Sequence, residues 1–199
     1  MPVLILLIDY LIGSLPFGYL LVRLQTGADV RSLGSGNIGA TNVLRTTGRA
    51  AAVGTLILDI AKGFFAVWLM ARFTTQSPVW MSAAALAVMA GHAYPVFLKF
   101  HGGKAVASFI GAFLYLTPAP MAAVLVLFVI VAAATRHISM ASIIASGSLP
   151  LAAWFIEHPP APVLIATLAA GVFVIYRHRA NLSRIRAGTE FTLDLGERK

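Results

Sequence analysis

A run of small and polar residues between two apolar stretches is the part of this chain best suited to chemistry. It reads Gly34-Ser35-Gly36-Asn37-Ile38-Gly39-Ala40-Thr41-Asn42 and is followed by Arg45. Glycine lets backbone N–H groups approach a ligand closely, the hydroxyl and amide side chains add hydrogen-bond donors, and arginine adds a fixed positive charge. The run therefore predicts an anion-binding loop.

A second cluster, Gly102-Gly103-Lys104, directly precedes an apolar segment. The N–H groups of a helix's first turn and the positive end of its dipole would face the loop, so a phosphate fits there. The triplet is not a Walker A loop, because Leu98 stands five residues before Gly103 and Ala105 follows the lysine. Nucleotide hydrolysis is therefore not expected. The alternative is a glycine turn whose lysine only signals topology.

Further polar residues follow the last apolar segments. His178, Arg179 and Asn181 come directly after the last one, where they could join the same site or simply anchor the chain to acidic lipids. Ser139 is a candidate cap for the apolar helix that follows it. One turn further in, Ser142 could offer a donor to the same cavity.

Asp59 and Lys62 lie three residues apart within an apolar segment, on one face of the expected helix. An ion pair is therefore predicted, either for structure or as part of a cavity wall or phosphate contact. His92 is interpreted as a hydrogen-bonded packing or kink residue. We find no set of histidines and carboxylates with metal-ligand spacing, so neither a metal nor another cofactor is expected.

Composition defines the class of protein. The 199 residues are 59% hydrophobic and only 11% charged, with a mean hydropathy of +0.85. This is more apolar surface than one small soluble core could bury, and soluble proteins run nearer 25% charged. The chain contains no cysteine, which excludes disulfides and thiolate nucleophiles. We expect an all-α integral membrane protein with a single membrane-embedded domain over residues 1–199.

Seven apolar segments can be recognised, and we expect each to be a transmembrane helix. The first is not a cleavable signal, because no basic residue precedes it. Connections on alternate sides differ strongly in charge, since one side receives most of the fifteen basic residues. The positive-inside rule then places the N-terminus outside and the C-terminus in the cytoplasm. The segments are Val3–Val22, Ala50–Ala71, Val79–Leu98, Ala105–Leu116, Ala119–Thr135, Met140–Ile156 and Ala161–Tyr176.

The fourth segment is too short for an ordinary spanning helix. A helix from Lys104 to Leu116 would be roughly 20 Å long, against roughly 30 Å of hydrocarbon. Either the Gly102–Lys104 loop is recessed below the cytoplasmic surface, or this segment and the next form a re-entrant hairpin. A recessed loop would imply a pocket, because irregular backbone at membrane depth must line a cavity or pack inside protein. Such a pocket suits a ligand with a phosphate head and a hydrophobic tail.

The three polar motifs together resemble the bacterial acyl-phosphate:glycerol-3-phosphate acyltransferases. The resemblance rests on residues 34–45, on Gly102-Gly103-Lys104-Ala105-Val106-Ala107 and on His178-Arg179-Ala180-Asn181. It implies a seven-helix enzyme of the bacterial inner membrane, with its active site facing the cytoplasm. Such an enzyme moves a fatty acyl group from acyl phosphate to the 1-hydroxyl of glycerol 3-phosphate. The products are phosphate and 1-acylglycerol 3-phosphate (lysophosphatidic acid), an intermediate of phospholipid biosynthesis.

The resemblance also implies roles for individual residues. The expected catalytic residues are Ser35, Arg45, Lys104, His178 and Asn181. The expected substrate-binding residues are Gly36, Asn37, Thr41, Asn42, Gly102, Gly103 and Ser142. This sequence departs from the family pattern at Ala180, where glutamate is expected, and at His101 and Ala105, where lysine and glycine are frequent.

Several alternatives stay open on sequence alone. The proton of the attacking hydroxyl could go to His178 or to substrate phosphate, and an acyl-enzyme on Ser35 is a third route. A phosphate-ester transporter or lipid translocase with the same basic pocket is the rival function. The expected partners are the two phosphate-bearing substrates and membrane lipid, with neither nucleic acid nor an obligate protein partner.

Overall fold

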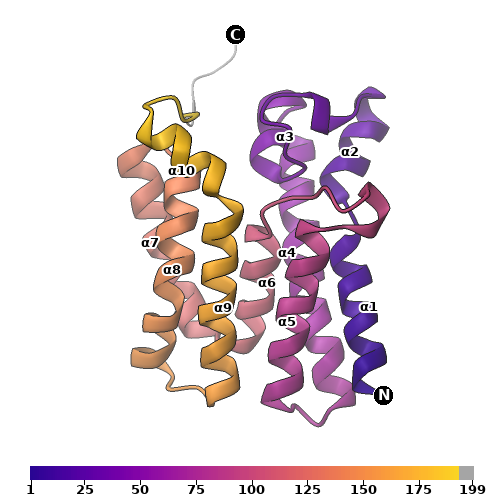
Figure 1. Cartoon of the computed structure of the whole chain (residues 1–199), viewed down its shortest axis with the longest axis vertical. Coiled ribbons are helices and arrows are strands. Elements are labelled where there is room, and N and C mark those ends of the chain that lie inside the picture. Colours follow the sequence, from indigo (N-terminus) through magenta and orange to yellow (C-terminus); the bar gives the residue numbers. More distant parts are fainter. Residues whose placement is uncertain (193–199) are drawn as a thin grey trace.

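The computed structural model describes residues 1–192 and is a bundle of helices that run along one long axis (Figure 1). No strand occurs within these residues. Two short 3-10 turns, η1 (Val30–Ser32) and η2 (Val96–Leu98), lie among the connections. The α-helices are α1 (Pro2–Ser14), α2 (Phe17–Thr26), α3 (Ala40–Thr46), α4 (Arg49–Phe73), α5 (Pro78–Ala93), α6 (Val106–Leu116), α7 (Pro118–Thr135), α8 (Ile138–Ile156), α9 (Ala161–Arg177) and α10 (Arg179–Arg186).

All seven predicted apolar segments form helices. By length and hydropathy, five helices of the described chain could cross a membrane, or six if the pair α9 and α10, bent by 56°, counts as one. The predicted short segment is confirmed, since α6 has only 11 residues. Large apolar side chains on the outside of the bundle, such as Leu4, Leu7 and Leu11, are exposed and suited to lipid contact.

The first apolar segment is divided into α1 and α2, contrary to the expectation of one continuous helix over Val3–Val22. The break lies at Leu15–Pro16, because proline has no N–H group and its ring disfavours helical backbone before it. The Leu15 carbonyl at this break is hydrogen-bonded, because Lys62 Nζ donates to Leu15 O at 2.9 Å. The two helices together still form one apolar span of 25 residues.

Glycines allow close packing between helices. A Cβ atom at Gly63 of α4 would collide with the backbone carbonyl of Ser108 in α6, and one at Gly111 of α6 would collide with that of Ile60 in α4. The helices α1 and α5 meet through glycines in the same way. Small residues at helix crossings are the usual means of close packing in membranes. This packing fixes α6, whose first residue follows the Gly102–Lys104 loop.

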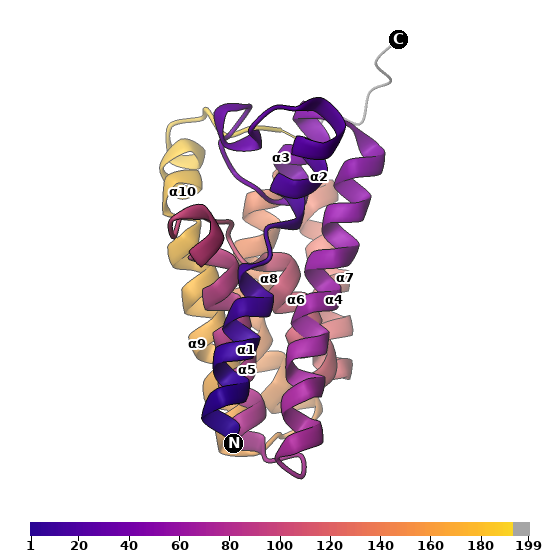
Figure 2. The same cartoon turned by 90° about the vertical axis from the view of Figure 1, so that its right-hand side faces the viewer.

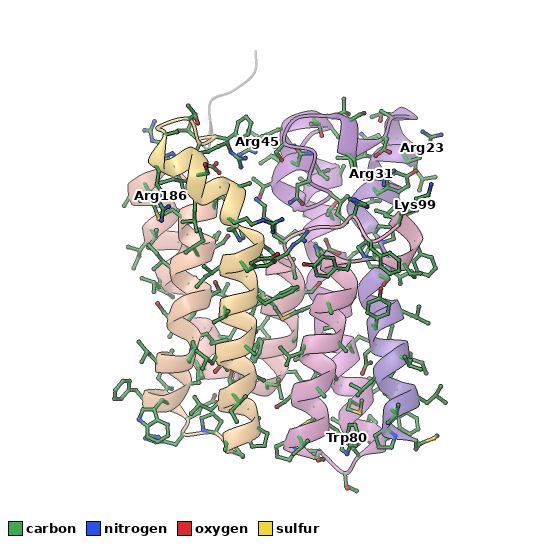
Figure 3. The ribbon with its side chains drawn as sticks, viewed as in Figure 1. Arg23, Arg31, Arg45, Trp80, Lys99 and Arg186 are labelled. Carbon is green, nitrogen blue, oxygen red and sulfur yellow. The ribbon has the colours of Figure 1, made fainter. Side chains whose placement is uncertain are left out.

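The two ends of the bundle differ in chemistry. Figure 3 shows the labelled cations at one end and Trp80 at the opposite end. The helices α2, α3 and α10 lie at the cationic end, where Figure 2 also shows the last described residues crossing. In Figure 1 the loop before α6 lies below the level of α3 and α10, as a recessed loop requires. The labelled cations are Arg23, Arg31, Arg45, Lys99 and Arg186.

Candidate active site

The Ser35 loop is organised from inside by Asn42. Its side-chain nitrogen donates to the carbonyls of Leu33 and Asn37 at 3.0 and 2.8 Å, and its oxygen accepts from Ser35 N at 2.8 Å. Asn42 is buried. The side chain therefore shapes the loop, and the prediction that it also contacts substrate stays a prediction.

The same loop leaves Ser35 on its exposed surface. Gly34 and Gly36 on either side have φ angles of +55° and +71°, which L-residues with side chains rarely adopt. Asn37 Oδ1 accepts from Gly39 N at 2.8 Å, immediately before α3 begins. The loop is thus a fixed, tightly turned support on which Ser35 is exposed, and the contact of its hydroxyl with substrate stays a prediction.

The glycines of the Gly102–Lys104 loop serve close packing. Their N–H groups donate to the carbonyls of Ala93 and His92 at 3.2 and 3.1 Å, and a Cβ atom at Gly103 would collide with the His92 ring. Arg177 donates to the Gly103 carbonyl at 2.8 Å and to that of Gly102 at 3.3 Å. Because both amides are already engaged, anion donors here must come from Lys104 and the first turn of α6.

A buried polar network lies beneath this loop. Lys62 Nζ lies 2.7 Å from Asp59 Oδ1, which confirms the predicted ion pair, and both side chains are 3% exposed. The His92 ring lies 3.6 Å from the same carboxylate and shares a 3.2 Å hydrogen bond with Ser108 of α6. The interpretation of His92 as a hydrogen-bonded packing residue is confirmed. The network ties α4, α5 and α6 together under Gly103.

Four of the five expected catalytic residues lie in one cationic cluster. Lys104, Arg45 and His178 are close enough to share the field of one carboxylate, that of Glu190, and Asn181 is hydrogen-bonded to it. Burial lowers the pKa of Lys104 to about 8, with nearby arginines acting in the same direction. Burial also lowers the pKa of Arg45. Lys104 is therefore still cationic at neutral pH, in a place where an anion would be strongly attracted.

His178 lies just beyond α9 and is buried. Its Nδ1 lies 2.8 Å from the Val174 carbonyl, which favours the tautomer with the proton on Nδ1 and a lone pair on Nε2. Burial, and then the charge of Lys104, lower the pKa of His178 to about 4. The imidazole is therefore neutral at pH 7 and able to accept a proton.

Glu190 is the functional candidate that the sequence did not reveal. It accepts hydrogen bonds from Ser139, Asn181 and Arg184. Burial opposes its ionisation, but these three donors together lower the pKa of Glu190. Its position in the segment after α10 carries no periodic pattern, so no sequence signal pointed to it.

The two serines of α8 make different hydrogen bonds. The expectation that Ser139 caps the helix is wrong, since His137 is the N-cap and the Ser139 hydroxyl donates to Glu190 instead. The Ser142 hydroxyl donates to the Ile138 carbonyl of its own helix at 2.8 Å. Ser142 lines a small cavity of about 20 Å³ among apolar side chains, and its contact with substrate stays a prediction.

An open groove of about 690 Å³ joins the loops on one side of the cluster. Gly36 of the Ser35 loop, Gly102 and Arg177 all line it, together with Tyr94 and Phe100. Lys104 and His178 do not line this groove, but each lies within two residues of a residue that does, Gly102 and Arg177. Within residues 1–192, no group of three or more histidine and carboxylate side chains is placed to hold a metal ion.

A family profile described as glycerol-3-phosphate acyltransferase matches residues 3–188 of this chain. The chain belongs to this family. It is 45% identical over 183 residues to a glycerol-3-phosphate acyltransferase of Geobacter sulfurreducens, covering 92% of this chain and 93% of that protein. It is 40% identical over 197 residues to the one of Desulforamulus reducens, covering 99% and 96%.

Two solved structures of family members are also similar to this chain. One is the crystal structure of PlsY (YgiH), an integral membrane glycerol 3-phosphate acyltransferase, in its glycerol 3-phosphate form. It has a TM-score of 0.92 and 33% identity, and the match covers 97% of this chain and 96% of that one. The lysophosphatidic acid form has a TM-score of 0.89 and 32% identity, with 97% and 95% covered. The chain is therefore an integral membrane acyltransferase of this family.

Proposed function

We propose that the chain transfers a fatty acyl group from acyl phosphate to the 1-hydroxyl of glycerol 3-phosphate, giving 1-acylglycerol 3-phosphate and inorganic phosphate. The observation that carries the proposal is the cationic cluster of Lys104, Arg45 and His178 in an apolar bundle of membrane-capable helices. Phosphate groups would lie among the cations while the acyl chain extends along apolar helices. The names of the relatives support the acceptor and the product.

The chemistry needs no covalent enzyme intermediate, because acyl phosphate already carries a good leaving group. The hydroxyl oxygen of glycerol 3-phosphate attacks the acyl carbonyl carbon, and the carbon–oxygen bond to phosphate breaks with its electron pair on phosphate. The hydroxyl proton passes to Nε2 of neutral His178 and then to phosphate. The protein's contribution is to align the two substrates and to offset negative charge.

The predicted residues divide between the two phosphates. The Ser35 loop, with Gly36, Asn37 and Thr41, holds acyl phosphate, while Lys104 and Arg45 hold glycerol 3-phosphate. Asn42, Gly102 and Gly103 act mainly by shaping the loops that present these groups. Ser142 contributes to the wall of the pocket.

The topology that fits this reaction has seven crossings, an outside N-terminus and a cytoplasmic cationic end in the inner membrane. The gathering of labelled cations at one end supports it. The chain has no cysteine, so single cysteines can report sides without background. In intact spheroplasts, Glu157→Cys should react with an impermeant thiol reagent and Arg186→Cys should not. The reverse pattern would overturn this orientation.

The decisive assay uses detergent-purified protein, acyl phosphate and glycerol 3-phosphate, without any membrane gradient. Formation of lysophosphatidic acid is expected. A transporter or translocase would form none, and that outcome would remove the enzymatic proposal.

A single-turnover experiment with labelled acyl phosphate separates direct transfer from an acyl-enzyme. Direct transfer predicts that label never appears on the protein, in the wild-type chain or in Ser35→Ala. Label that is bound covalently to the wild-type protein and absent from Ser35→Ala would establish the serine intermediate instead.

A further inference from the structure

The loop around η2 exposes large apolar side chains. Phe97 and Phe100 are 58% and 57% exposed, and Val96 is 40% exposed. The loop is anchored between the two rings, because Leu98 is buried in one packed core with Val22 of α2. Exposed aromatic rings gathered beside polar residues indicate a surface that another molecule covers.

The backbone of this loop makes a tight turn. Lys99 and Phe100 have φ angles of +53° and +62°, in the left-handed region that residues with a side chain rarely adopt. Hydrogen bonds hold the turn, since Phe100 N donates to Pro95 O at 2.9 Å and His101 N donates to Leu98 O at 3.1 Å. Such a backbone persists only where the surrounding structure fixes it. The exposure of the two rings therefore belongs to a fixed conformation of the loop.

Two exposed cations lie beside the rings. Lys99 stands between the rings in sequence, and Arg23 of α2 directly follows Val22, which packs in the same core as the loop. Figure 3 shows both cations on the side of the bundle where α1 and α2 lie. Within residues 1–192, neither of them forms an ion pair with a carboxylate.

The neighbouring carboxylate is already neutralised. Asp29 and Phe100 both line the open groove beside this loop. Arg31 donates to Asp29 twice, from Nε to Oδ1 at 3.0 Å and from Nη2 to Oδ2 at 2.7 Å. These side-chain hydrogen bonds are the main cause of the lowered pKa of Asp29, and the charge of Arg23 acts in the same direction. With Lys99 included, three cations face one carboxylate, so the surface is suited to an anion.

This surface lies where the apolar side of the bundle meets the cationic end. Exposed leucines follow one face of α1 and the residue after it, at a spacing of three or four residues. The η2 turn contacts α1, and Figure 1 shows α2 and the loop above the upper end of α1. A lipid chain packed along this face would therefore place its headgroup beside Arg23 and Lys99. The leucines are Leu4, Leu7, Leu11 and Leu15.

We propose that Arg23, Phe97, Lys99 and Phe100 form a binding site for an anionic glycerophospholipid of the leaflet that meets the cationic end. The phosphate diester of the headgroup lies between the two cations, the rings contact the upper part of the acyl chains, and the chains follow α1. Basic residues at the ends of membrane helices are a common element of anionic-lipid recognition. The site takes up a lipid that is neither substrate nor product of the acyl transfer.

The test measures which lipid occupies this surface. The chain has no cysteine, so Val96→Cys can carry a single fluorophore beside the site. The labelled full-length protein is placed in phosphatidylcholine nanodiscs that contain doxyl-labelled phosphatidylglycerol or doxyl-labelled phosphatidylcholine at equal mole fraction. Because a doxyl group quenches only a nearby fluorophore, the two quenching curves give the relative affinity for the anionic lipid. Phosphatidylglycerol should be preferred, and Lys99→Gln or Arg23→Gln should lower this preference about fivefold, which corresponds to about 1 kcal/mol.

Arg186→Gln is the matched control, because it removes one positive charge from the same end but on the other side of the bundle (Figure 3). It should leave the lipid preference unchanged. A general attraction between cations and anionic lipid would lower the preference equally in Arg186→Gln and Lys99→Gln, and that result would overturn the proposal. Equal quenching by the two lipids in the labelled protein without further substitutions would overturn it as well.

Two further measurements separate a lipid from a soluble anion. Phe97→Ser should weaken quenching by both lipids, because it removes contact with the acyl chains, and unchanged quenching would contradict the role of the rings. Excess inorganic phosphate, at constant ionic strength, should not displace phosphatidylglycerol, because it has no acyl chain. If it does displace the lipid, the cations form a site for soluble phosphate and the lipid proposal is wrong. Neither acyl phosphate nor glycerol 3-phosphate is present, so the outcome does not depend on the proposed function.

Discussion

Two groups of charged side chains lie on either side of the Gly102–Lys104 loop, and they are balanced differently. Beneath the loop, Asp59 and Lys62 neutralise each other at 2.7 Å, and Lys62 also donates to a backbone carbonyl. At the loop's other side, Lys104, Arg45 and Arg184 surround a single carboxylate contributed by Glu190. The charges of the first group cancel, whereas the second has an excess of positive charge.

The difference indicates which group is structural and which is for ligands. A buried pair with its own hydrogen bonds fixes neighbouring helices, and an excess of cations attracts anions. Gly103 connects the two, since the absence of its Cβ lets the loop rest on His92 of the lower network. The lower group thus supports the loop that carries Lys104.

The largest expected effect comes from breaking the lower pair. Asp59→Ala leaves Lys62 as a buried cation without its carboxylate, which typically costs about 3–5 kcal/mol of stability. Thermal unfolding of the detergent-purified protein measures the change. The double variant Asp59→Ala/Lys62→Met should recover most of the stability. A single variant that melts like the wild type would show that the pair has no structural role.

The second prediction concerns the imidazole of His178, which lies in the cationic cluster with Lys104 and Arg45. His178→Ala should lower kcat by about 10²–10⁴-fold if the neutral ring takes the hydroxyl proton, with little change in the melting temperature. Steady-state rates of lysophosphatidic acid formation measure it. A loss smaller than about tenfold would instead assign the proton to substrate phosphate.

Loss of the Lys104 charge should have a somewhat smaller effect. Lys104→Met keeps the apolar stem but removes the charge that stabilises phosphate, and loss of one such group typically lowers rates by about 10²–10³-fold. Lys104→Arg should retain part of the activity, since its charge is kept in an altered shape. Equal loss in both variants would show that the position requires the shape of lysine and not only its charge.

The sequence predicted the parts of both groups that depend on local spacing or on topology. Asp59 and Lys62 were found because residues three apart share one helical face. The topology predicted that the connections carrying the other site residues lie on one side of the membrane, because alternate connections between spanning helices do so. These residues are Arg45, Lys104, His178 and Asn181.

The residues that were missed, or whose roles changed, depend on contacts between distant segments. Ser139 and Glu190 are 51 residues apart, and nothing in either local pattern indicates that they meet. Asn42 has a side chain that could donate to a ligand, but its amide nitrogen already donates to two backbone carbonyls. These carbonyls come together only in the folded loop. Gly103 could have been an anion-binding amide or a steric necessity, and the position of the His92 ring favours the second.

The smallest expected effect is on pH dependence, and it distinguishes the two groups without any loss of folding. Burial lowers the pKa of Lys104 to about 8, so the cation is present below this pH and is lost as the pH rises through it. The kcat/KM for glycerol 3-phosphate should therefore fall by up to about tenfold between pH 7 and 9, while substrate phosphate, with a second pKa of about 6, stays fully ionised. In Lys104→Arg this fall should disappear, because arginine keeps its charge in this range. In Glu190→Gln the fall should begin at lower pH, because the carboxylate that helps to keep Lys104 protonated is gone. If kcat/KM falls to the same extent in Lys104→Arg, another group must titrate in this pH range. The affinity of the cationic cluster for anions would then not depend on the charge of Lys104.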